Sequence, residues 1–117
     1  MDQQAGVLPD QGPYIEYFFS SDNEIVRASE AIAALSNGTR LRILQLLESR
    51  EMSVVEMTRM IDGHSQSSVS QHLAALRKAG LVHCRKESTR MVYRVDDVRL
   101  YPLLDMIKSV FCPPGRH

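Results

Sequence analysis

Apolar residues that follow the first 20 positions recur at three- and four-residue intervals, which predicts a helix with one buried face. Ser21 followed by Glu24 has the spacing of a capping box, so we expect this helix to begin at Ser21. We expect it to end at Asn37-Gly38, because glycine tolerates the left-handed conformation of a helix C-terminal cap. The apolar positions of this helix are Ile25, Ala28, Ile32 and Leu35.

Two more helices are expected in the next 25 or so residues. The first begins near Thr39, and its nearly continuous apolar character predicts a central, buried helix. The second is short and begins at Ser53, which repeats the capping-box spacing with Glu56. A tight turn is expected at Asp62-Gly63-His64. The apolar positions are Leu41, Ile43, Leu44, Leu46 and Leu47 in the first of these helices, and Val54, Met57 and Ile61 in the second.

The fourth predicted helix differs from the others in its outward face. We expect it to begin around Ser65 and to run to Ala79, with Gly80 at its C-terminal cap. Its outward face carries small polar side chains first and cations last, whereas a helix that only had to be soluble would more often carry Glu and Lys pairs. The buried stripe is Val69, Leu73 and Leu76, and the outward face is Ser67, Gln71, Ala74 and Lys78, flanked by Ser68 and Ser70.

Two short strands and a final helix complete the pattern. β-Branched and aromatic residues predict strands over residues 81–86 and 91–95, with a turn between them. The last helix is expected over about residues 98–111, and it begins as late as Tyr101 if Pro102 is to lie in its first turn. Its apolar stripe exceeds what one small domain can cover, which predicts a two-fold dimer. The stripe is Leu100, Leu103, Leu104, Ile107, Val110 and Phe111.

The order of four helices, two strands and one helix predicts a mainly α (α+β) fold. A short helix, a glycine-containing turn and a polar-faced helix make a helix-turn-helix, and the hairpin makes a two-stranded β wing. We expect one winged helix-turn-helix domain over residues 21–112 and a C-terminal tail over 113–117. Residues 1–20 are expected to be a tail with a short aromatic helical turn, formed by Tyr14, Tyr17, Phe18 and Phe19.

Composition narrows the class of protein. The 117 residues fit one domain, and 44% hydrophobic with 24% charged residues excludes disordered and fibrous classes. No apolar run approaches the roughly 20 residues that span a bilayer, and the acidic N-terminus is unlike a signal peptide. Two cysteines do not make a disulfide framework. We therefore expect a cytoplasmic protein with no membrane partner.

The neutral net charge hides an uneven distribution of charge. Residues 1–37 carry six acids against Arg27 alone, and residues 70–94 carry six cations against Glu87 alone. A concentrated basic segment is what phosphate binding needs, although a charge run by itself is also typical of a solvated surface.

Candidate DNA contacts fall on the fourth helix and the wing. Glutamine pairs with adenine and serine bonds to several base edges, so the polar face of the helix is the candidate for base reading, with a merely solvated polar face as the alternative. Cations nearby are candidates for phosphate or wing contacts, which provide affinity rather than specificity. The base-reading candidates are Gln66, Ser67, Ser68, Ser70 and Gln71, and the cations are Arg40, Arg77, Lys78, Arg85, Lys86 and Arg90.

The histidines and cysteines have individual expectations. His72 flanks the buried stripe and is expected to be packed and hydrogen-bonded. Cys84 shares a strand face with Val82, which indicates a half-buried hydrophobe rather than a reactive thiol. Cys112 ends the last helix and is the candidate redox residue. No ligand spacing appears among the other histidines, which are expected at the solvated surface: His64, His83 and His117.

Three segments resemble the ArsR/SmtB family of bacterial winged-helix repressors over about residues 25–112. They are SQSSVSQHLAALRKAGLV (Ser65 to Val82), LSNGTRLRILQLL (Leu35 to Leu47) and RKESTRMVYRV in the wing. The resemblance implies a homodimer held by its first and last helices, which sits on a double-stranded DNA operator and leaves when an effector arrives. A two-fold dimer requires an imperfect palindrome with half-sites about one helical turn apart.

The resemblance does not identify the effector. Arsenic-type members carry a CVCDL-like motif where this chain reads SVVEM, and zinc-type members use Asp and His where the last helix has Asp97 and Asp105 but no His. We therefore expect no metal and no cofactor. A third, more similar branch senses reactive sulfur or oxidants through two cysteines. Cys112 falls on the second of these positions, but Gln45 occupies the first.

Several functions stay open on the sequence alone. The chain is expected to be a repressor released by an effector, such as an oxidant or reactive sulfur. The alternatives are a constitutive DNA-binding regulator, a metal-responsive repressor with a non-standard site, and a winged helix used only for protein contacts. An enzyme is not expected, because the sequence shows no nucleophile with a base, paired acids, metal cluster or glycine-rich phosphate loop.

Overall fold

A computed structural model describes residues 21–112 of the chain. The predicted aromatic turn around Tyr14 and the predicted C-terminal tail lie outside these residues. In chain order, the elements are α2 (Asp22–Leu35), α3 (Gly38–Ser49), β1 (Met52–Ser53), α4 (Val54–Met60), α5 (Gln66–Lys78), β2 (Val82–Glu87), β3 (Arg90–Val95) and α6 (Leu100–Phe111). Apart from β1, this order is the predicted one.

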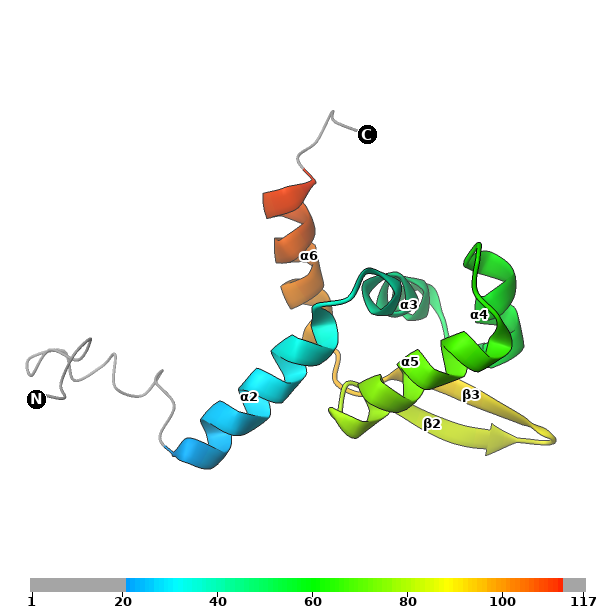
Figure 1. The fold of residues 1–117 in the computed structure, drawn as a ribbon, viewed down its shortest axis with the longest axis horizontal. Coiled ribbons are helices and arrows are strands. Elements are labelled where there is room, and N and C mark those ends of the chain that lie inside the picture. Colours follow the sequence, from blue (N-terminus) through cyan, green and yellow to red (C-terminus); the bar gives the residue numbers. More distant parts are fainter. Residues whose placement is uncertain (1–20, 113–117) are drawn as a thin grey trace, which may run out of the picture.

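The helices α2 and α6 project away from a body made of α3, α4, α5 and the sheet (Figure 1). The hairpin of β2 and β3 extends from the other side of this body. As a result, the acidic start of α2, with Asp22 and Glu24, and the tip of the hairpin lie at opposite ends of the part formed by residues 21–112 (Figure 1).

One apolar core joins the helices of the body to the sheet. The predicted stripe of α5 is completely buried, and α3 is the central helix that its sequence predicted. Burial of each such side chain contributes about 1.5–3 kcal/mol relative to its exposed form. The side chains with no exposed surface are Ile43, Leu44, Met57, Val69, Leu73 and Leu76.

Serine side chains begin three of the helices. At α2, the Ser21 hydroxyl accepts a hydrogen bond from the Glu24 amide at 3.3 Å. At α4 the capping box is complete, because Ser53 and Glu56 each bond the backbone amide of the other. Ser65 caps α5 in the same way, so all three predicted starts are confirmed.

The predicted role of Asn37-Gly38 is wrong. Helix α2 already ends at Leu35, and Asn37 instead caps the start of α3, where its side-chain oxygen accepts from the Arg40 amide at 3.1 Å. Gly38 is the first residue of α3 and has no positive φ. Asparagine is common both at the ends and at the starts of helices. Here it caps the start of α3, because α3 follows α2 after only two residues.

The sheet has a third strand that the sequence did not predict. β1 pairs antiparallel with β3 through Met52 and Ser53, which gives the strand order β1-β3-β2. A strand of two residues is too short to show a period-two pattern, so alternation of apolar residues gives no sign of it. Its pairing anchors the base of the wing to the body beside α4.

The end of α5 sets the direction of the wing. The Gly80 amide bonds the Arg77 carbonyl at 3.0 Å and the Leu81 amide bonds the Leu76 carbonyl at 2.9 Å, which is a Schellman arrangement. It requires the positive φ of 79° that Gly80 adopts. The chain therefore leaves α5 on a fixed path into β2, and the predicted cap at Gly80 is confirmed.

Two apolar surfaces are left uncovered within the described residues. On α6, Leu100 and Leu104 are buried, whereas the other side of the helix is exposed, up to 77% at Phe111. The exposed apolar residues are Leu103, Met106, Val110 and Phe111 on α6, and Ile25, Val26 and Ile32 on α2. Among the described helices, none has the length and apolar character needed to cross a membrane.

Candidate nucleic-acid interface

Helix α5 has the two distinct faces that its sequence predicted. Val69, Leu73 and Leu76 hold it against the core, and the opposite face is open to solvent. Four of the five base-reading candidates are exposed on α5: Gln66, Ser67, Ser70 and Gln71. No hydrogen bond to another described residue occupies their side chains, so their polar groups are available to a partner.

Ser68 and His64 are bound to each other rather than to solvent. Ser68 is half-buried, and its hydroxyl lies 2.9 Å from Nδ1 of His64. The other ring nitrogen of His64 lies 3.2 Å from the hydroxyl of Thr39 at the start of α3. The expectation that His64 lies at the solvated surface is therefore wrong. The spacing of four residues between His64 and Ser68 is the only sequence signal for this contact, and nothing local indicates Thr39.

His72 is packed and hydrogen-bonded as predicted. Its Nδ1 accepts from Nε of Arg40 at 3.2 Å, and its ring meets that of His64 edge-on, with 6.0 Å between the ring centroids. Burial, the Arg40 guanidinium and His64 together lower the pKa of His72. Arg40 also donates to the Ala34 carbonyl at 3.5 Å, so this predicted phosphate contact is held between α2 and α5. His83 is exposed, as expected.

The arginines of the wing belong to a connected series of ion pairs. Arg85 pairs with Glu51 and, at 2.9 Å, with Glu87, and the two carboxylates raise the pKa of Arg85. Arg90 lies 3.1 Å from Glu87 and 3.6 Å from Glu56. Both arginines are predicted phosphate contacts, and in this structure their positive charges are paired with carboxylates.

Glu56 connects this series of ion pairs to the body. It accepts from the Ser53 amide and pairs with Arg50 at 3.0 Å, and these interactions lower its pKa to about 2. The same carboxylate therefore caps α4 and holds Arg90 of the wing. Its capping role was predicted from the sequence, but its contact with the wing was not.

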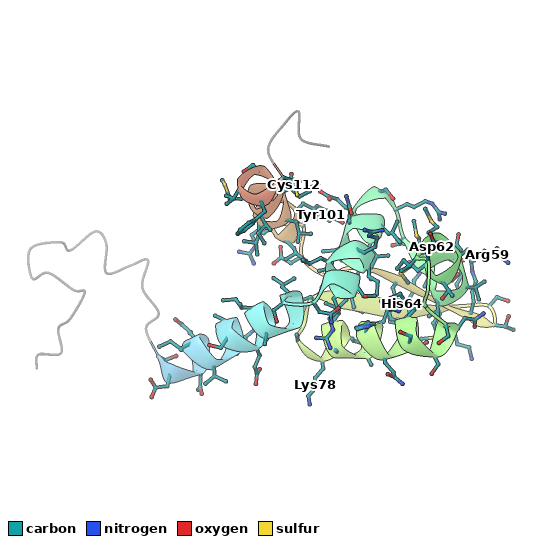
Figure 2. The ribbon with its side chains drawn as sticks, turned by 45° about the horizontal axis from the view of Figure 1, so that its top comes forward. Arg59, Asp62, His64, Lys78, Tyr101 and Cys112 are labelled. Carbon is teal, nitrogen blue, oxygen red and sulfur yellow. The ribbon has the colours of Figure 1, made fainter. Side chains whose placement is uncertain are left out.

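Three of the predicted cations keep their charge free of carboxylates. Within residues 21–112, neither hydrogen bonds nor ion pairs are formed by the side chains of Arg77, Lys78 and Lys86, all of which are exposed. Lys78 points away from the body at the end of α5 (Figure 2). The exposed face of α5 is thus flanked by free positive charge from its own last turn and from the hairpin.

The groove between α3 and α6 brings Gln45 and Cys112 together. It has a volume of about 430 Å³, and Glu48 of α3 lies 3.8 Å from Lys108 of α6 beside it. Cys112 is exposed at the far end of α6 (Figure 2). The two positions that correspond by resemblance to a cysteine pair therefore line one groove, with a single thiol.

Cys84 is buried in the sheet, in agreement with its predicted role as a hydrophobe. It lies opposite Tyr93, whose pKa is raised by burial and by the neighbouring Cys84 thiol. Among the described residues, no three His, Cys, Asp or Glu side chains are close enough to hold a metal ion.

The comparisons with known proteins agree with this geometry. Residues 37–83 match the model of the bacterial regulatory proteins of the arsR family. The transcriptional activator HlyU of Vibrio cholerae is 35% identical over 86 residues, which are 74% of this chain and 79% of HlyU. The chain belongs to the ArsR family. Another member, the biofilm growth-associated repressor of Agrobacterium fabrum, is 32% identical over 75% of this chain and 77% of its own length.

Solved structures of the ArsR family have the same fold. The structure of Vibrio cholerae HlyU superposes with a TM-score of 0.69 at 33% identity, over 79% of this chain and 99% of HlyU. A homodimeric winged helix-turn-helix DNA-binding domain from Mycobacterium bovis gives 0.70 at 31% identity, over 80% of this chain and 88% of that domain. The predicted fold and family are thereby confirmed, and this ArsR-family chain is a transcriptional regulator rather than an enzyme.

Proposed function

We propose that the chain is a homodimeric repressor that binds an imperfect palindrome with one α5 in the major groove of each half-site. The observation that carries this proposal is the exposed face of α5, where Gln66, Ser67, Ser70 and Gln71 have no partner within the described residues. Helices of this kind read base edges in the major groove. Lys78 and Lys86, which are also free, supply contacts to the phosphates on either side.

The uncovered apolar sides of α2 and α6 support the dimer. Both surfaces would be exposed in a monomer, and apolar surfaces of this extent mark association sites in soluble proteins. The relative from Mycobacterium bovis is homodimeric. A closed two-fold dimer places two copies of α5 in equivalent positions, and the DNA site must repeat that symmetry.

Selection from random DNA duplexes tests the proposal without knowledge of the natural operator. We expect the enriched sequences to contain two inverted half-sites with centres about 10 base pairs apart, and hydroxyl-radical footprinting to show equal protection of both. Enrichment of a single asymmetric site contradicts the dimer, and the absence of any enrichment contradicts sequence-specific binding. A reporter placed behind the selected site distinguishes repression from activation.

A second proposal concerns release through Cys112. This thiol is exposed and lies in the groove with Gln45, whereas Cys84 is buried. Without a cysteine at position 45, modification proceeds on Cys112 alone. Its thiolate attacks an S–S bond of a polysulfide or of a small disulfide, which leaves a persulfide or a mixed disulfide on Cys112 and releases the other sulfur fragment as a thiolate. Alternatively, peroxide oxidises the Cys112 thiols of two chains to a disulfide between them and is itself reduced to water. The groove joins α6 to α3, so a group added to Cys112 would push these helices apart and change the distance between the two α5 helices.

Mass spectrometry after treatment with polysulfide or peroxide, combined with gel shifts, tests this second proposal. Cys112→Ser should keep its DNA bound under oxidant, and Cys84→Ser should release it like the wild type. Release of Cys112→Ser by oxidant, or an intrachain Cys84–Cys112 bridge, contradicts the proposal. No response to oxidants, polysulfide or metals would identify a constitutive regulator.

A further inference from the structure

A polar cluster connects four segments of the chain behind the exposed face of α5. His72 lies on α5, Arg40 and Thr39 lie on α3, and His64 lies in the turn between α4 and α5. Arg40 also reaches the last turn of α2 through the Ala34 carbonyl. The cluster therefore contacts the helix proposed to read DNA, the central helix and one of the helices proposed to form the dimer.

The contact between Arg40 and His72 requires a neutral imidazole. Nε of Arg40 is always a donor, so Nδ1 of His72 must carry a lone pair, and the ring proton must be on Nε2. Protonation of Nδ1 removes the only acceptor for this bond. It also places a second positive charge 3.2 Å from the guanidinium group.

The charged groups around the cluster do not offset such a charge. On the inner side, His72 faces Arg40 of α3 and His64 of the turn. On the far side of Arg40, a hollow is lined by Glu30 of α2 and Lys78 of α5, but neither forms an ion pair with Arg40. Within the described residues no carboxylate is bonded to His72, so Arg40 and His64 oppose protonation of this ring and no bonded carboxylate assists it.

We propose that the contact between Arg40 and His72 is an acid-sensitive latch that positions α5 for specific DNA binding, with the His64 contacts as a second support. This inference rests on the proposed function, since it concerns the helix that reads the operator. With the His72 ring neutral, Arg40 holds the middle of α5 through His72, and Thr39 holds its first turn through His64 and Ser68. Protonation of His72 breaks the first link and lets α5 shift against α3, so that the base-reading side chains no longer line up with the bases.

The expected pH window follows from the environment of His72. Its pKa lies below the ordinary value near 6.5, because burial and Arg40 disfavour the charged ring. The unfolded chain therefore binds the proton more readily than the folded chain, and stability decreases as the pH falls below about 6.5. Specific DNA binding should be lost over the same window, whereas phosphate attraction by Lys78 and Lys86 should persist.

The experiment measures the affinity of the full chain for a selected operator and for random DNA between pH 8.0 and 5.0. The ratio of the two affinities isolates specificity from general attraction. For the wild type we expect this ratio to fall about tenfold, the effect of one hydrogen bond to a charged group. His72→Gln keeps an acceptor that does not titrate, so its ratio should be flat. His83→Gln removes an exposed histidine and should behave as the wild type.

The outcomes separate the latch from the function on which it rests. A wild-type ratio that is flat with pH, or one that falls equally in His72→Gln, overturns the latch while sequence-specific binding stands. A wild type that shows no preference for any sequence at pH 7.5 overturns the proposed function itself. If His72→Gln fails to fold, NMR of the wild type still tests the latch. The His72 ring should be protonated at Nε2 only, and the Arg40 and Ser68 amides should shift at its midpoint; any other tautomer contradicts the latch.

Discussion

Gln71 lies near the middle of the exposed face of α5, one turn from Ser67. Gln71→Ala removes a side chain that can make two hydrogen bonds to one base, so we expect operator binding to weaken by about 1–3 kcal/mol and binding to random DNA to change little. Quantitative gel shifts measure both. Gln45→Ala, a matched change on α3, should leave both affinities unaltered. Equal losses on both DNAs would show that Gln71 contacts phosphate instead.

Glu56 gives an expectation for stability at low pH. Its pKa is lowered from 4.5 to about 2, so its charged form stabilises the folded chain fully above about pH 4.5, and this stabilisation is lost as the pH falls toward 2. Glu56→Gln should lower the melting temperature at pH 7, and its difference from the wild type should shrink across that window. Glu30→Gln, on the surface of α2, is the control. A difference that does not vary with pH would show that the charge of Glu56 is not what stabilises the folded chain.

The histidines show what residue patterns predict and what they miss. His72 is predicted correctly because its place beside the buried stripe follows from helical periodicity. His64 is predicted wrongly because its partner Thr39 is 25 residues away, and the spacing of neighbouring residues does not indicate a contact over such a distance along the chain. The same limit applies to Arg85, whose positive charge is evident from the sequence but whose pairing with Glu51 depends on how the hairpin lies against the body.

The charged side chains of the wing differ in how freely they can contact DNA. Lys86 is free, whereas Arg85 is held by two carboxylates. We expect Lys86→Ala to weaken operator and random DNA alike and to reduce the slope of log affinity against log salt by about one unit. Arg85→Ala should have a smaller effect, because its charge is already neutralised. Titrations at several salt concentrations measure the slopes, and a larger effect of Arg85→Ala would show that its ion pairs open on DNA.

Long elements with caps are predicted well, and short ones are not. For α5 the Ser65 and Gly80 caps fix both ends within a residue, since each cap has a chemical signature. Asn37-Gly38 carries a signature of both an end and a start, and only the close succession of α2 and α3 decides between them. β1 is a strand because its backbone pairs with β3, so it depends on this pairing rather than on the identity of its own two residues.

At the scale of the molecule, the proposed dimer depends on the uncovered side of α6. Met106 is 63% exposed there, and Met106→Lys would place a charge in the interface. We expect this variant to sediment as a monomer and to lose affinity for the palindrome while its helix content is unchanged. Met60→Lys, a matched change at an exposed position of α4, should sediment as the wild type does. If both variants remain dimeric, the interface lies elsewhere.

The separation of charge along the molecule affects how quickly it finds DNA. The chain carries no net charge, yet its acids at the start of α2 and its free cations near α5 and the hairpin make it an electric dipole. The field of a polyanion turns such a molecule before contact, so that the hairpin leads and α2 trails. A neutral protein then arrives already oriented. The benefit appears in the association rate constant, which should fall with ionic strength, while the lifetime of the bound complex is set by α5.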